Sequence, residues 1–122
     1  MDPRIERILQ KVQKPARYTG GEYGQIMKNR DEVDVRFALC FPDTYEIGMS
    51  NLGMRILYGV LNNMPGVWCE RVFEPWRDMS DELRAAGIPL YALESGDPVK
   101  DFDIIGFSVG YEMSYLGMLD ML

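Results

Sequence analysis

Apolar residues in this chain form short segments with two kinds of spacing, one typical of helices and one typical of buried strands. The first segment predicts an N-terminal helix, because its apolar residues recur at helical spacing: Ile5, Ile8, Leu9 and Val12. A stripe of this kind must pack on something, either this domain or a neighbour. Residues 35–41 then form a short run rich in β-branched and aromatic side chains, bounded by Pro42, and predict a strand.

The same alternation continues to the last residue. We expect a helix capped by Ser50 or Asn51 and ended by Pro65-Gly66, with an apolar stripe at Ile56, Leu57, Val60, Leu61 and Met64. A strand over 67–73 follows, then a helix marked by Met79, Leu83 and Ala86 with Gly87 just past its end. Residues 89–93 predict a short edge strand, and 104–109 a central parallel strand. A last helix is predicted by Tyr115, Met118, Leu119 and Leu122.

Strands that alternate with helices predict an α/β fold, a doubly wound and mostly parallel sheet with helices on both faces. We divide the chain into an N-terminal helix with a glycine-rich arm, residues 1–33, and an α/β body, residues 34–122. Such a sheet usually has about five strands, so the body reads as truncated, the N-terminal piece of a longer protein. We expect an incomplete sheet to leave an open edge and to make the chain self-associate.

The composition of the chain excludes several classes of protein. The chain has 122 residues, 47% of them hydrophobic and 26% charged, as in a globular protein, with no apolar run long enough to span a membrane. A cytoplasmic location is therefore expected. Residues 1–17 carry +3 and the whole chain −6, so the remainder carries −9, which argues against general binding of nucleic acid.

Histidine is absent from the sequence, which excludes a Ser-His-Asp triad and histidine metal ligation within this chain. The two cysteines, Cys40 and Cys69, lack metal-ligand spacing and lie in predicted strands, so we expect inert thiols and no metal site.

Two loops follow predicted strands and qualify as a binding site, because ligands of open α/β sheets lie beyond the carboxyl ends of the strands. We select as candidate cofactor-binding residues Asp43, Tyr45, Glu46, Gly48 and Ser50 in the first loop, with Ser108 and Gly110 in the second. The structural alternative is that Asp43 and Ser50 are helix caps, Tyr45 is half-buried and Gly110 only turns the chain. We predict that residues 42–50 and 108–112 converge at one rim of the sheet.

Both loops resemble those of cobalamin-binding domains. The family pattern Asp-x-His-x-x-Gly matches residues 43–48, except that Tyr45 stands where the axial histidine would be. The second pattern, Ser-x-Leu, matches at Ser108 and has Gly110 in place of leucine. The resemblance therefore implies a cobalamin site without a histidine ligand to cobalt, since a phenol with a pKa near ~10 is a poor substitute.

Longer strings extend the likeness over most of the chain: 14–18, 20–23, 33–38, 41–50, 70–73 and 101–108. In order, they resemble the N-terminal domain of an uncharacterised bacterial family in which a B12-binding-like domain precedes a radical SAM domain. That resemblance implies a downstream partner domain whose Cys-x-x-x-Cys-x-x-Cys motif holds a [4Fe–4S] cluster and S-adenosylmethionine. The motif is absent from this sequence, so no radical chemistry is assigned to its residues.

Three functional readings follow. The first is a cobalamin-binding-like domain of a radical SAM enzyme with a flavodoxin-like fold. The second is a cofactor-free α/β interaction module that packs on the radical SAM barrel. The third is an independent flavodoxin-like domain that binds another nucleotide.

Overall fold

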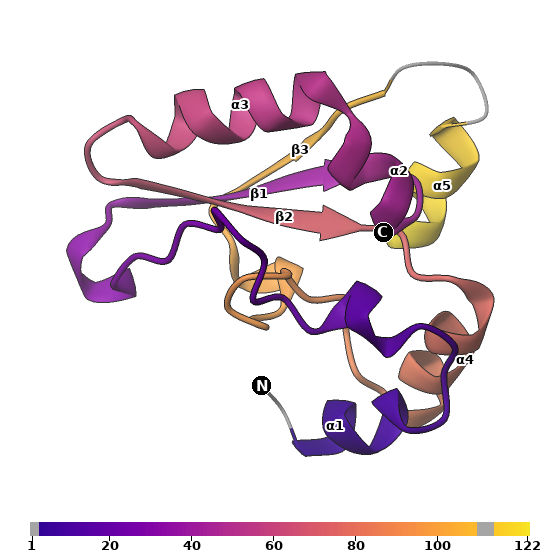
Figure 1. The fold of residues 1–122 in the computed structure, drawn as a ribbon. Helices are drawn as coiled ribbons and strands as arrows, with labels where there is room; N and C mark the ends of the chain where they lie inside the picture. Colours follow the sequence, from indigo (N-terminus) through magenta and orange to yellow (C-terminus); the bar gives the residue numbers. More distant parts are fainter. Residues whose placement is uncertain (1–2, 110–113) are drawn as a thin grey trace.

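The sheet at the centre of the structure, a computed structural model that describes residues 3–109 and 114–122, has three parallel strands. They are β1 (Val35–Phe41), β2 (Val67–Phe73) and β3 (Ile104–Phe107), in the order β2-β1-β3. Cys40 of β1 lies opposite Val72 on one side and Phe107 on the other. The predicted parallel α/β fold is confirmed, and the boundaries predicted for β1 and β2 agree with the structure (Figure 1).

Helices surround this sheet on both faces. In chain order they are α1 (Pro3–Leu9), α2 (Tyr45–Ser50), α3 (Leu52–Asn62), α4 (Arg77–Ala86) and α5 (Ser114–Met121). Three 3₁₀ turns join them, η1 (Pro15–Tyr18), η2 (Arg30–Glu32) and η3 (Val99–Asp101). Figure 1 shows α3 along one face of the sheet, α1 and α4 together on the opposite side, and α2 and α5 beside the carboxyl ends of β1 and β2.

The helix α3 buries a different face from the one predicted. Asn51, not Ser50, caps it, because the Asn51 side chain accepts a hydrogen bond from the Met54 amide. Met54 and Tyr58 pack against the strands, whereas the predicted stripe is mostly exposed, at Ile56, Leu57, Val60 and Met64. The reason is a polar anchor: the buried Asn62 amide exchanges two hydrogen bonds with the backbone of Cys69, of 3.0 and 2.9 Å. That pair fixes the rotation of α3, and apolar spacing alone does not encode it.

The last helix, α5, also buries a different face from the one predicted. Ser114, Gly117 and Met121 of α5 are buried, whereas the predicted stripe is exposed at Tyr115, Leu119 and Leu122. A Cβ on Gly117 would lie 2.6 Å from the Pro42 carbonyl oxygen, so only glycine allows α5 to sit this close to the end of β1. Met121 then joins a core with Ala38, Cys40 and Val72.

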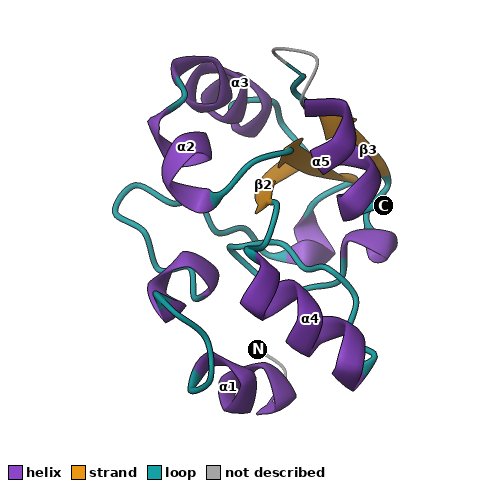
Figure 2. Cartoon of the chain, turned by 90° about the vertical axis from the view of Figure 1, so that its right-hand side faces the viewer, coloured by secondary structure: helices purple, strands orange, loops and turns teal. Residues whose placement is uncertain are grey.

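The N-terminal helix packs on this domain. Ile5, Ile8 and Val12 form a core with Met79 and Leu83 of α4. The predicted end of α4 is confirmed, because Gly87 adopts a left-handed conformation with a φ of 68° and its amide bonds back into the helix. Figure 2 shows α1 and α4 side by side, away from α3.

Two predicted strands differ from the structure. Residues 89–93 form no strand: Pro89 has no N–H, and the segment closes on itself through a Tyr91–Pro98 bridge and a bond from the Val99 amide to the Leu90 carbonyl. The predicted strand 104–109 is shorter, since β3 ends at Phe107, and it lies at an edge of the described sheet and not at its centre; Ile104 and Ile105 remain 47% and 41% exposed. That this edge makes the chain self-associate stays a prediction.

Among the described residues no helix has the length and apolar character that a bilayer span requires.

Candidate functional site

The predicted convergence of the two loops is confirmed for the described residues. Strands β1 and β3 are parallel neighbours, and the Ser108 amide donates a 2.9 Å hydrogen bond to the Cys40 carbonyl. Residues 42–50 and 108–109 therefore leave the same rim of the sheet. Because β1 connects to β2 on one side and pairs with β3 on the other, this rim is the point where strand order reverses. Gly110 lies outside the described residues, as do 111–113.

Tyr45 is engaged by the N-terminal arm. Its hydroxyl donates a hydrogen bond to the Glu22 carboxylate, and its ring meets that of Phe73 edge-on, with centroids 5.8 Å apart. Burial, followed by the Glu22 carboxylate, raises the pKa of the Tyr45 phenol to about 12. The phenol therefore keeps its proton at neutral pH, and its oxygen is directed to the arm.

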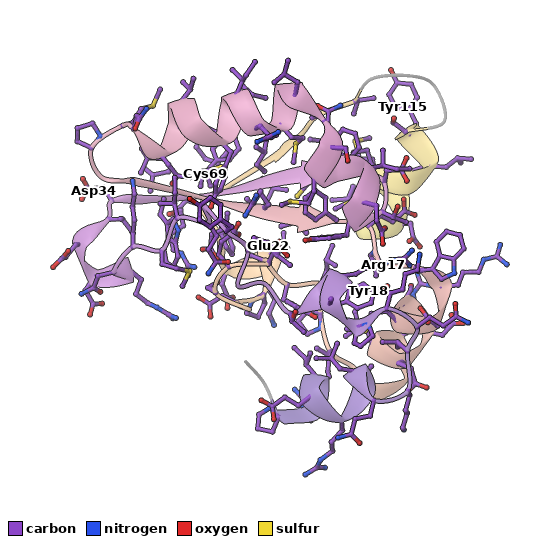
Figure 3. The ribbon with its side chains drawn as sticks, in the orientation of Figure 1. Arg17, Tyr18, Glu22, Asp34, Cys69 and Tyr115 are labelled. Carbon is purple, nitrogen blue, oxygen red and sulfur yellow. The ribbon has the colours of Figure 1, made fainter. Side chains whose placement is uncertain are left out.

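The other candidate residues of α2, Glu46, Gly48 and Ser50, also make contacts with other residues of this chain. Glu46 is exposed and pairs with Arg17 at 2.6 Å; that contact is the main cause of the lowered pKa of Glu46. The Ser50 hydroxyl donates to the Glu46 carbonyl at 2.8 Å, so Ser50 is not a cap. Gly48 is buried against Phe73, and a Cβ there would overlap the aromatic ring. Figure 3 labels Arg17, the residue of the arm that pairs with Glu46.

Asp43 and Ser108 remain the candidates closest to the rim itself. One Asp43 oxygen accepts the Thr44 amide at 2.7 Å, and the Asp43 carbonyl accepts the Glu74 amide at 2.9 Å. The β1 loop is thereby tied to the end of β2. Asp43 also lines an open cleft together with Glu74, Arg84 and Asp120.

Glu74, which also lines this cleft, has a carboxyl pKa well above its ordinary value. Desolvation by burial raises the pKa of its carboxyl from 4.5 to about 7, with Asp120 and Asp43 adding repulsion. Asp120 itself pairs with Arg84 at 2.7 Å. A carboxyl that titrates near neutrality in a cleft is a feature that often marks functional sites.

We predict that Glu74 makes the chain less stable as the pH rises from 4.5 to about 7. In that window folded Glu74 holds a proton that the unfolded chain has released, so stability falls with pH and levels off above the folded pKa. Urea denaturation of the wild type and Glu74→Gln on both sides of the window measures this. The substitution should reduce the fall and leave the part that comes from Glu94, whose pKa burial also raises; equal pH dependence in the two proteins would refute the assignment.

Sequence reasoning missed two ion pairs in the interior, one that joins β1 to β2 and one that joins β2 to the turn at Glu94. Arg36 of β1 pairs with the fully buried Glu70 of β2, and Arg71 pairs with Glu94 at 2.7 Å. The available signal was the presence of charged residues inside two apolar strand runs, since parallel strands covered on both faces are usually apolar throughout.

Both cysteines are free and buried. Burial raises the pKa of each thiol to about 12, which agrees with the predicted lack of reactivity. The described part of the chain contains no group of three or more acidic or cysteine side chains that can hold a metal ion.

Comparison with models of protein families identifies the family of this chain. A family model described as the N-terminal region of radical SAM proteins matches residues 53–122, from α3 to the end of α5. This chain belongs to that family. Comparisons with curated proteins and with solved structures give no match. Within the radical SAM N-terminal domain, Ser108 and Gly110 fall inside the matched region, whereas residues 42–50 precede it.

Proposed function

We propose that this radical SAM N-terminal domain is a cobalamin-binding-like domain, and that cobalamin held at the β1–β3 rim has no protein ligand to its cobalt. The observation that carries the proposal is the position of that rim. It is the one place where the two candidate loops leave adjacent parallel strands at a reversal of strand order.

The side chains present fit a cobalamin that contacts residues of the β1–β3 rim. They do not fit a cobalamin whose cobalt is ligated by a side chain of α2. Tyr45 replaces the axial histidine of the resembled family, but its phenol is protonated and bonded to Glu22. Glu46, Gly48 and Ser50 are occupied by contacts within the chain. We therefore assign contact with the cofactor to Asp43 and Ser108, and retain Gly110, which is outside the described residues, on the sequence pattern alone.

Cobalamin, when bound, supplies a cobalt centre that carries an alkyl group. The residues of this chain would bind and orient it: Asp43 as an acceptor and Ser108 as a small neighbour that leaves space at the end of β3. The [4Fe–4S] cluster and S-adenosylmethionine belong, in this proposal, to a downstream radical SAM domain, because this sequence lacks the cluster motif.

Gel filtration of the chain with hydroxocobalamin, followed by visible spectroscopy, tests the proposal. We expect the cofactor to elute with the protein, Tyr45→Phe to retain it equally well, and Ser108→Phe to lose it. Wild-type protein that retains no cobalamin would overturn the cobalamin assignment and favour the alternative, a cofactor-free module that packs on the barrel. Loss of binding in Tyr45→Phe would overturn the claim that the phenol is not a ligand.

A further inference from the structure

The helix α5 lies against the carboxyl ends of the strands (Figure 1) and is held there by contacts of three kinds. Met121 enters the core that includes residues of β1 and β2. Asp120 forms a 2.7 Å ion pair with Arg84 of α4. Gly117 lies directly over the carboxyl group of Glu74, because a Cβ at Gly117 would be 2.6 Å from one of its oxygens. The helix therefore rests on Glu74, the residue that follows β2.

The opposite face of α5 contributes little to this docking. Its four large apolar side chains are between 56% and 77% exposed: Tyr115, Leu116, Leu119 and Leu122. The helix has only eight residues, and isolated helices shorter than about 12–15 residues are marginal in water. Whether α5 stays on the sheet therefore depends on the contacts at its buried face, and the charge of Glu74 acts on one of them directly.

Charged groups from three elements face Glu74. They line one cleft with it: Asp43 from the β1 loop, Arg77, Asp81 and Arg84 from α4, and Asp120 from α5. When Glu74 is ionised, the lining of this cleft holds four carboxylates and two arginines. The backbone of Glu74 is fixed beside the other carboxylates, because its amide donates a 2.9 Å hydrogen bond to the Asp43 carbonyl. A movement of α5 is then the simplest way to separate Glu74 from Asp120.

Glu74 attracts α5 when it is protonated and repels it when it is ionised. A protonated carboxyl donates a hydrogen bond to the Asp120 carboxylate, whereas two ionised carboxylates in the same place repel each other. Burial, followed by repulsion from Asp120, raises the pKa of Glu74 to about 7, so both forms are populated near neutral pH. Undocking of α5 returns the carboxyl to water and lowers its pKa, so proton release and undocking favour each other.

We infer that α5 is a pH-sensitive element, which docks on the sheet while Glu74 is protonated and leaves it when Glu74 ionises against Asp120. Because Gly117 also lies over the Pro42 carbonyl oxygen, undocking uncovers the end of β1 and the start of the loop at residues 42–50. The movement of α5 thus controls access to the β1–β3 rim. The inference concerns the helix alone and holds whichever ligand occupies the rim.

Amide hydrogen exchange of the ¹⁵N-labelled chain, well below and well above the Glu74 pKa and corrected for the intrinsic effect of pH, tests the inference. We expect the opening equilibrium at residues 118–122 to rise at least about fivefold with pH, since a one-unit pKa difference between docked and undocked states corresponds to a tenfold change. The amides of β1 and β2 should stay far more protected than those of α5 at both pH values, because the opening is local. No cobalamin is present, so the result is independent of the proposed function.

Two variants and a control complete the test. Glu74→Gln keeps the shape of the side chain without its charge and should make the opening of α5 nearly independent of pH. Asp120→Asn should also reduce the pH dependence, although the lost pair with Arg84 raises the opening at both pH values. Glu82→Gln, on α4 and 4.0 Å from Lys11, is the control and should behave as the wild type.

Three results would overturn the inference. The first is an α5 opening in the wild type that does not change with pH. The second is a pH dependence in Glu74→Gln equal to that of the wild type. The third is exchange of the α5 amides only together with those of β1 and β2, which would show that the helix does not open by itself.

Discussion

Replacing Glu70 by alanine is expected to lower the free energy of unfolding by about 3–5 kcal/mol, the usual result of removing one partner of a buried ion pair. Glu70 is fully buried, bonds to Arg36 and accepts the Ser95 amide at 2.9 Å. Arg36 is held between the rings of Trp68 and Phe102, and once Glu70 is removed its remaining carboxylate partner is Asp97, at 2.9 Å. Urea denaturation, followed by circular dichroism, measures the change.

The control for Glu70 is an exposed ion pair on the same chain. Glu82→Ala breaks the contact with Lys11, which is long at 4.0 Å, and should change stability by less than about 1 kcal/mol. The double substitution Arg36→Met with Glu70→Leu should recover most of the loss, because no charge is then left buried without a partner. A loss below about 1 kcal/mol in Glu70→Ala would show that the existing pair of Arg36 with Asp97, at 2.9 Å, is enough to neutralise the arginine.

Replacing Gly48 by alanine is expected to cost about 1–3 kcal/mol by overpacking. Gly48 lies in α2, where alanine would ordinarily favour the helix, but its Cβ would overlap the Phe73 ring. The ring must then shift, which disturbs its edge-on contact with Tyr45. Thermal and urea denaturation of the variant measure the effect.

Gly59 provides a matched control in α3. A Cβ there meets nothing within 4 Å, so Gly59→Ala should stabilise the chain by about 0.5–1 kcal/mol. Phe73→Leu combined with Gly48→Ala should recover part of the loss by vacating the space. If Gly48→Ala retains full stability but loses cobalamin, the glycine serves the cofactor and not the packing of α2 on β2.

Local patterns were reliable where the determining interactions are close in sequence. The apolar runs of β1 and β2 define both strands, and Gly87 ends α4 because a left-handed residue there satisfies the last turn of the helix. The convergence of the two loops also followed from sequence, because strands that alternate with helices run parallel and their carboxyl ends then lie at one edge of the sheet.

Where several orientations of a helix or a side chain are locally equivalent, the sequence pattern could not predict which one forms. Apolar residues surround much of α3, so several rotations bury a comparable amount, and the bonds from Asn62 to the Cys69 backbone select one. In α5 the selecting feature is Gly117, which permits close contact with the end of β1. Tyr45 was a candidate in the binding loop, but its link to Glu22 depends on where the arm crosses the domain.

The sequence by itself determined the parallel α/β class, the strands β1 and β2 and the meeting of the two loops at one rim, because these depend on short-range spacing and on the common direction of the strands. Only the tertiary structure decided which helix faces are buried, how Arg36 and Arg71 are neutralised, and that the arm contacts Tyr45 and Glu46. Those outcomes depend on contacts between segments far apart in the chain, whose energies no local pattern records.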